Sequence, residues 1–331
     1  MRLLDAPAAA LAWLGRQGMR AVAISVFAGL ALPPLAALFK PIFAPALVMM
    51  LLLAFLRVDP AELRGYFTRT GPVLAATAWN MLAVPVIFGL GLTAAGIEKD
   101  GLYIALMLHA LAPPIISSAA IAALMGLDAA LSLATLIVCI VLTPLTAPVF
   151  AALFIGPSIA ISPLALGWKL FAMLAGAALV AAALRKIAGP PWIARQKERL
   201  DGVNVITLFV FAIALMDGVP ATIMARPLLA LGFVALAFAI SLGMIGLTML
   251  IFVRLGRSSA LALGLASGSR NMGLMMAAAG GAVPDLTWLY LAMVQFPIYL
   301  LPQMVKPLVW RIPSPRRPPT ADPAAPDRDK M

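Results

Sequence analysis

The nine residues ASGSRNMGL at positions 266–274 place an arginine, Arg270, inside a long apolar stretch of this 331-residue chain. An arginine at the centre of a membrane-spanning helix costs about 2.5–3.5 kcal/mol to insert, and such residues usually line a cavity or mark a pathway. The glycine and the serines that precede Arg270 loosen the helix, and broken helices survive in a bilayer only where they line a cavity within the protein. This stretch therefore predicts an interrupted membrane-spanning helix at a functional site.

The composition of the whole chain is that of a membrane protein. Hydrophobic residues make up 63% of the sequence and charged residues 11%, and the mean hydropathy is +1.03. Soluble domains have about 45–50% apolar and about 25% charged residues, so the soluble globular class is excluded. One histidine and one cysteine leave no material for a His/Cys metal site, and acids, bases and nucleophiles are scarce within the apolar stretches. We therefore expect no metal, no cofactor and no enzymatic activity.

Ten stretches are apolar and long enough to cross a bilayer, which takes about 20 residues. They lie at 19–38, 40–56, 71–95, 101–126, 129–155, 163–184, 203–220, 227–253, 259–283 and 286–310. The predicted fold is therefore an all-α polytopic membrane protein with ten transmembrane helices.

The basic residues fall almost entirely on one side of these ten spans. With the N-terminus inside, 19 of the 24 Lys and Arg residues lie in the inner segments, and only Lys40, Lys99 and Arg226 lie in the outer ones. Because cytoplasmic loops collect Lys and Arg, both termini are expected in the cytoplasm. We expect a multi-pass protein of a cell membrane, such as the inner membrane of a bacterium. The same asymmetry explains the net charge of +11 without a nucleic-acid partner.

An even number of spans predicts two inverted five-helix repeats, at 19–156 and 157–311. The fourth span is interrupted by Ala112-Pro113-Pro114 and Ser117-Ser118, and the ninth, in the matching position, is interrupted at 267–271. Paired interruptions in corresponding positions of two halves are the best sequence indication of a transport site. Outside the repeats we expect an interfacial segment on the inner surface at 1–18 and a disordered cytoplasmic tail at 312–331.

This pattern resembles the bile acid:sodium symporter family, which belongs to a superfamily of ten-helix carriers. In that family the fourth and ninth helices unwind and cross near mid-membrane, and the ninth carries an E-x-G-x-Q-N-x-G-L motif. Gly268, Asn271 and the closing Gly273-Leu274 match this motif. Asn80 precedes Pro85 by five residues, where the family has a glutamine. The resemblance implies a core of spans three to five and eight to ten, and a panel of spans one, two, six and seven.

Two positions depart from the family motif, since Ala266 stands at its glutamate and Arg270 at its glutamine. In the family these positions help to bind two sodium ions, and sodium prefers oxygen ligands that include a carboxylate. None of the 13 acidic residues lies near the middle of a predicted span, and a fixed guanidinium repels a nearby cation. We therefore expect that transport is not coupled to sodium at these positions.

The interrupted spans hold the candidate substrate-binding residues. Arg270 would attract an anion or stand permanently in place of a sodium ion; alternatively, the carbonyl groups of the broken fourth helix hold it away from substrate. His109 titrates in a range suited to proton coupling, although a lone histidine is more often hydrogen-bonded at a helix interface. The remaining candidates would bind substrate through hydrogen bonds or, alternatively, hold the helices together: Asn80, Ser117, Ser118, Ser267, Ser269 and Asn271.

The predicted function is secondary transport of a small organic anion by alternating access. A sodium-coupled symporter of bile-acid or organic-acid type and an uncoupled or channel-like carrier are alternatives of the same class. A non-transporting membrane receptor or scaffold is an alternative from another class, and it would not need paired helix breaks around a buried charge. The expected partners are the organic anion and the lipid bilayer.

The charge asymmetry leads to a topology prediction. A reporter enzyme that is active only in the periplasm, fused after Met331, should show no activity, because the inner segments carry the basic residues. The same reporter fused after Lys99, in a predicted outer loop, is the positive control. Activity of the C-terminal fusion would contradict an even number of spans with both termini inside.

Overall fold

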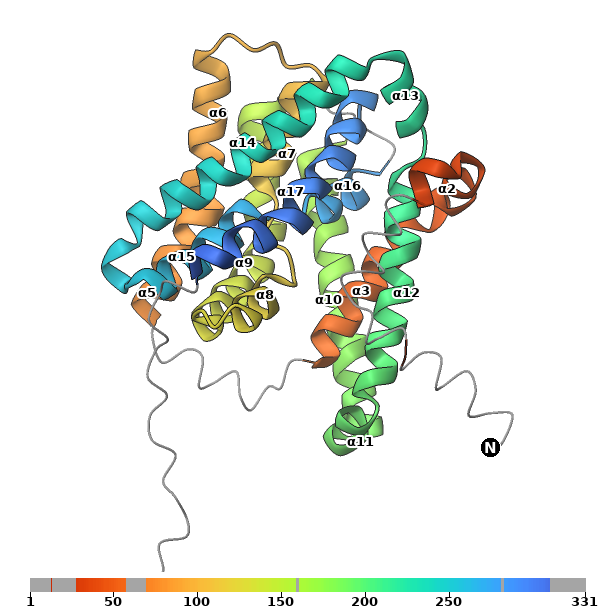
Figure 1. Ribbon diagram of the computed structural model, residues 1–331, viewed down its shortest axis with the longest axis vertical. Helices are drawn as coiled ribbons and strands as arrows, with labels where there is room; N and C mark the ends of the chain where they lie inside the picture. Colours follow the sequence, from red (N-terminus) through yellow and green to blue (C-terminus); the bar gives the residue numbers. More distant parts are fainter. Residues whose placement is uncertain (1–12, 14–27, 58–69, 159–160, 281–282, 310–331) are drawn as a thin grey trace, which may run out of the picture.

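The computed structural model describes residues 13, 28–57, 70–158, 161–280 and 283–309, and shows an all-helical membrane protein (Figure 1). In this part of the chain, six helical stretches are long and apolar enough to cross a membrane, and the bent pair α12 and α13 makes a seventh. The longer helices are α2 (Pro33–Phe39), α3 (Phe43–Arg57), α5 (Thr70–Ala78), α6 (Val84–Ala94), α7 (Gly101–Leu111), α8 (Ser118–Leu124), α9 (Ala129–Phe150), α10 (Pro163–Ala188), α11 (Pro190–Arg195), α12 (Lys197–Leu215), α13 (Val219–Ala225), α14 (Pro227–Ile251), α15 (Arg257–Gly268), α16 (Met272–Ala279) and α17 (Asp285–Val309).

The start of the described chain differs from the prediction. The boundary expected at 38–40 between the first two spans falls inside one continuous helical run, Pro33–Arg57. Lys40–Ile42 forms a 3-10 turn that carries the chain onward, and Pro41 is tolerated at the beginning of such a turn because the missing N–H has no acceptor there. The predicted interfacial segment at 1–18 (apart from Trp13), most of the first predicted span and the predicted tail at 312–331 lie outside the described residues.

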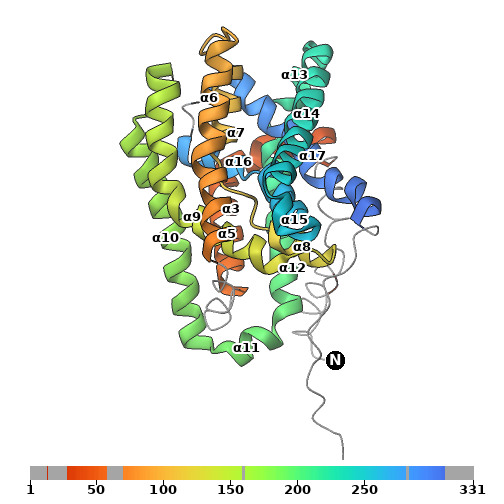
Figure 2. The ribbon, with the colours of Figure 1, turned by 90° about the vertical axis from the view of Figure 1, so that its left-hand side faces the viewer.

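Apart from α13, which packs on α14 and α17, the helices form two groups that lie beside each other. One group, here called the panel, consists of α2, α3, α10, α11 and α12. In it α3 packs against both α10 and α12, and α11 joins α10 to α12 at one end (Figure 2). The other group, here called the core, consists of α5–α9 and α14–α17, in which α14 packs on α15 and α17, and α9 packs on α5, α8 and α15.

The two apolar stretches that were predicted to be interrupted, 101–126 and 259–283, are both interrupted. The helix α7 ends at Leu111 and α8 begins at Ser118, and likewise α15 ends at Gly268 and α16 begins at Met272. Ala112 adopts an extended conformation, with φ −68° and ψ 143°, as the residue before a proline prefers. The proline pair therefore ends α7 for a local steric reason, and this prediction is confirmed.

The close packing of α15 on α14 depends on a glycine at the end of α15. A Cβ atom added at Gly268 would lie 2.7 Å from the carbonyl oxygen of Ser241 and 2.7 Å from a side-chain carbon of Ile245. The carbonyl oxygen of Ser241 is part of the α14 backbone and cannot move aside easily, so only glycine at position 268 allows α15 to pack this close to α14. By contrast, a Cβ atom at Gly243 on α14 would meet nothing within 4 Å.

We predict that Gly268→Ala lowers the thermal midpoint of the protein in detergent, because overpacking of this kind costs about 1–3 kcal/mol. Gly243→Ala is the matched control, and it should raise stability slightly, since glycine inside a helix is less stable than alanine by about 0.5–1 kcal/mol. Equal midpoints for the two variants would contradict the close approach of α14 and α15.

Candidate functional site

The interrupted segments of the two broken helices cross and pair with each other. The backbone N–H of Ile115 donates to the carbonyl oxygen of Ser269 over 2.9 Å, and the N–H of Asn271 donates to the carbonyl oxygen of Pro113 over 2.8 Å. Pro114 and Arg270 therefore face each other in an antiparallel bridge. In a bridge of this kind the N–H groups of the two facing residues point away from the partner, so a proline fits without the loss of a hydrogen bond.

The side chain of Arg270 lies inside this crossing and is only 1% exposed. Its Nε donates to the carbonyl oxygen of Ser267 over 3.1 Å, and its Nη1 donates to those of Ala110 and Ala112 over 2.9 and 2.8 Å. Both Nη atoms lie 3.3 Å from the carbonyl oxygen of Asn80, and Nη2 donates to the Asn80 side-chain oxygen over 3.1 Å. Five neutral oxygen atoms thus surround the guanidinium, and all three of its nitrogen atoms donate to them.

The carbonyl groups of Ala110 and Ser267 can accept from Arg270 because neither has its usual donor within the helix. In an α-helix the carbonyl of residue i accepts from the N–H of residue i+4. For Ala110 that residue is Pro114, which has no N–H. For Ser267 it is Asn271, whose N–H donates across the crossing instead. The third group, the carbonyl of Ala112, lies in the interruption itself.

The carbonyl of Asn80 is available because of a local widening of its helix. Trp79–Ala83 forms a π-helical turn, in which the N–H of Val84 donates to the carbonyl of Trp79 rather than to that of Asn80. The next residue, Pro85, has no N–H to offer. Turns of this type are frequent at functional sites, and here the turn presents a main-chain acceptor to Arg270.

Asn80 and Ser267 join Arg270 in one buried hydrogen-bonded cluster. The side-chain oxygen of Asn80 accepts from the Ser267 hydroxyl over 2.8 Å as well as from Arg270, and its amide nitrogen donates to the carbonyl of Ala76 over 2.8 Å. This amide therefore links the helices that carry residues 80 and 267 through side chains alone.

The other predicted site residues have different environments. Ser269 contributes its carbonyl to the crossing, and the side chain of Asn271 caps α16 by accepting from the N–H of Leu274 over 3.2 Å. Ser117 is exposed, whereas Ser118 is buried and its hydroxyl has no partner among the described residues.

His109 is fully buried, and neither of its ring nitrogens has a hydrogen-bond partner in the described part of the chain. The imidazole packs edge-on against Tyr290, with 5.8 Å between ring centroids. The helix-interface hydrogen bond that is usual for a lone histidine is therefore not formed with the described residues.

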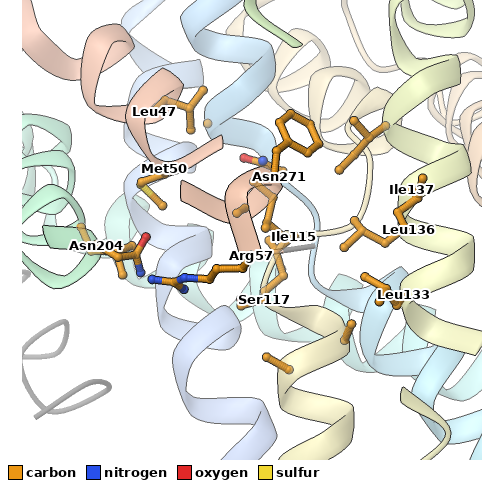
Figure 3. A pocket seen from close by; sticks show the side chains of 18 of the residues that line it. Leu47, Met50, Arg57, Ile115, Ser117, Leu133, Leu136, Ile137, Asn204 and Asn271 are labelled. Carbon is orange, nitrogen blue, oxygen red and sulfur yellow. The ribbon is translucent and has the colours of Figure 1, made fainter. Parts of the chain in front are cut away.

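A cavity of about 710 Å³ lies between the panel and the core, next to the crossing. Figure 3 shows the crossing residues Ile115 and Asn271 and the panel residues Arg57 and Asn204, all of which line this cavity. Of the predicted site residues, Ser117, Arg270 and Asn271 line it, whereas the other five do not. The lining is mainly aliphatic, and its charged members are Arg57, Arg185 and Arg270.

On the side of the crossing away from Arg57, the panel and the core are held together. The ring of Phe43 stacks on Phe211 at 4.9 Å and lies 5.2 Å from the ring of Trp288, whose indole N–H donates to the carbonyl of Leu215 over 3.1 Å. Next to these rings, Lys40 forms a 2.7 Å ion pair with Asp217 and also lies over Trp288.

Several lining residues were missed by the sequence analysis. Arg57 was counted only as an inner-loop charge, and Asn204 and Gln295 were passed over inside apolar stretches, although a polar residue in such a stretch is a usable signal. All three line the cavity. Nothing in the sequence brings Arg57 and Asn204 together, because they belong to different helices.

No protein-family model matches this sequence, and a search of curated proteins finds no match. The assignment of a function therefore depends on the crossing and the cavity themselves.

The oxygen cluster around Arg270 leads to a stability prediction. Arg270→Ala should lower the stability of the protein by about 3 kcal/mol or more, because it leaves several buried acceptors without a donor. Methylguanidinium added at millimolar concentration should restore part of this loss by entering the same cluster. Both effects are measured as thermal midpoints in detergent.

The matched control is Arg199→Ala, since Arg199 is exposed and bonds only to the half-buried side chain of Gln196 among the described residues. This variant should change stability by no more than about 0.5 kcal/mol and should not respond to methylguanidinium. If Arg270→Ala is as stable as Arg199→Ala, the guanidinium does not hold the crossing together.

Proposed function

We propose that this chain is a secondary transporter that moves a small organic anion across a cell membrane by alternating access. The observation that carries this proposal is the paired crossing of two broken helices beside a cavity. Interrupted backbone at membrane depth survives where it lines a cavity, and discontinuous helices form the substrate sites of many secondary transporters. A receptor or a scaffold requires neither feature.

The charge of the cavity favours an anion as the substrate. Its lining, among the described residues, contains three arginines and no aspartate or glutamate. The guanidinium of Arg270 is held by protein oxygens, so it acts on the anion through its charge, which is weakly screened in a low-dielectric interior. Asn271 and Ser117, which line the cavity beside it, offer hydrogen bonds to the substrate.

We further propose that Arg270 is the permanent cation of the crossing. A cluster of neutral oxygen atoms is also the environment that a hard metal cation prefers, and here a covalently attached guanidinium occupies it. An exchangeable sodium ion then has no place at this position. The resemblance to the bile acid:sodium symporter family, in which this position is a glutamine, is consistent with a divergent member that lost sodium coupling.

The proposal includes ten transmembrane helices in two inverted five-helix repeats, with both termini in the cytoplasm. Two features of the structure support the repeats. The order of a broken helix followed by a long helix occurs twice, as α7–α9 and as α15–α17. The two interruptions also run antiparallel to each other where they pair, as elements of opposite orientation do. The division into panel and core is the one that the family resemblance implies.

Uptake by proteoliposomes tests the function and the coupling together. We predict that a screen of carboxylates and sulfonates identifies a transported anion, and that replacement of external sodium by choline at constant ionic strength leaves its uptake nearly unchanged. The physical reason is that Arg270 already supplies the positive charge at the crossing. Liposomes without protein are the control.

Two results would contradict this prediction in different ways. Saturable dependence of uptake on sodium would favour the sodium-coupled symporter. The absence of uptake for every anion in the screen would favour a receptor or a scaffold.

A further inference from the structure

We propose that Arg57, assisted by Asn204, binds the charged group of the transported anion where the panel lines the cavity. This inference rests on the proposed transport function and deepens it. It states where the negative charge of the substrate is held, and therefore which kind of anion the cavity accepts.

Arg57 has hydrogen-bond donors that no other described residue uses. It is the last residue of α3, it lines the cavity, and its side chain is 38% exposed. Its Nη2 contacts a carboxylate oxygen of Asp201 at 2.8 Å and the carbonyl oxygen of Leu200 at 3.3 Å. Nε and Nη1 have no partner among the described residues, so they remain to bind an oxyanion.

The other arginines of the lining are less suited to direct contact. All three nitrogens of Arg270 are engaged at the crossing. Arg185 donates from Nη1 to the carbonyl oxygen of Leu56 over 3.0 Å, and so its positive charge lies close to Arg57. This part of the cavity therefore combines a guanidinium that can bind an anion with a second positive charge that attracts it.

Asn204 completes the site from the panel helix α12. It follows Asp201 by three residues, and residues at this spacing lie on the same face of a helix. Figure 3 shows the side chain of Arg57 extending toward that of Asn204 at the cavity wall. The amide N–H₂ group can donate to the anion that Arg57 binds. Asp201 is then a resident carboxylate that competes with the substrate for the same guanidinium.

The cavity between Arg57 and the crossing determines the rest of the substrate. Leu47 and Arg57 both line it from α3, and ten residues of helix span about 15 Å. The facing wall on α9 is aliphatic, with Leu133, Leu136 and Ile140. A cavity of about 710 Å³ lies within the range of about 300–1,000 Å³ that holds drug-sized ligands. The expected substrate is a carboxylate or sulfonate that carries an apolar body, rather than a small inorganic anion.

Binding to the detergent-solubilised full chain tests the inference with a charged and an uncharged probe of the same shape. The probes are naphthalene-2-sulfonate, as its choline salt, and naphthalene-2-sulfonamide, and affinity is measured by titration calorimetry. Arg57→Gln should weaken sulfonate binding about tenfold or more, since a charge-assisted hydrogen bond is lost, and should leave sulfonamide binding unchanged. Asp201→Asn should tighten sulfonate binding several-fold, because it removes the competing carboxylate.

The matched control is Arg199→Gln, which removes the same charge from α12 outside the cavity and should change neither affinity. Equal weakening of both probes by Arg57→Gln would show a structural role and overturn the inference. Sulfonate binding that is insensitive to Arg57→Gln and Asp201→Asn would also overturn the inference. A parent protein that binds neither probe would overturn it as well. Thermal midpoints show whether each variant is folded. If Arg57→Gln is not folded, the sulfonate affinity of Asp201→Asn tests the inference in its place.

This experiment separates the inference from the proposed function. Binding of the sulfonate through Arg57, with no anion taken up by proteoliposomes, would refute transport and leave the binding site in place. Uptake of the sulfonate that Arg57→Gln leaves unchanged would refute the binding site and leave transport in place.

Discussion

The guanidinium of Arg270, held by five oxygen atoms inside the helix crossing, is the interaction on which the rest of the structure depends. A backbone carbonyl without a donor costs several kcal/mol in a bilayer, where no water replaces the missing partner. The breaks in the two helices would leave three such groups in the protein interior, and the π-helical turn at Asn80 would leave a fourth. One side chain with five N–H donors satisfies them together, and so the breaks can exist where they do.

The same interaction gives the crossing its electrostatic character. The carbonyl groups of Ala110 and Ser267 lie at the C-terminal ends of α7 and α15, where the helix dipoles are negative. The guanidinium compensates these ends and leaves a net positive charge next to the cavity. Ions of opposite sign are attracted to such a charge, and no mobile cation is needed to create it.

The two ends of the panel meet the core differently, as the alternating access proposed above requires. Near Phe43, the first residue of α3, the aromatic rings and the ion pair of Lys40 with Asp217 join panel and core. At Arg57, the last residue of α3, a cavity lies between panel and core. The rings, the indole hydrogen bond and the ion pair are separate, modest contacts. Contacts of this size can be exchanged for others, whereas α9 of the core and α10 of the panel pack directly against each other.

How much of this could be predicted from the sequence depends on whether the relevant chemistry is local. Proline lacks an N–H wherever it occurs, so Pro113 and Pro114 alone place a helix break and free the carbonyl of Ala110, and the apolar composition alone requires a membrane. The use of that carbonyl is not local, because Arg270 reaches it from 160 residues away. The sequence left open whether Arg270 contacts an anion or is held by carbonyl groups, and it suggested a turn near residue 39 where the helix continues. Only the tertiary structure decided that the guanidinium is enclosed and that Arg57 and Asn204 share one cavity, because a side chain's partners depend on which helices pack together.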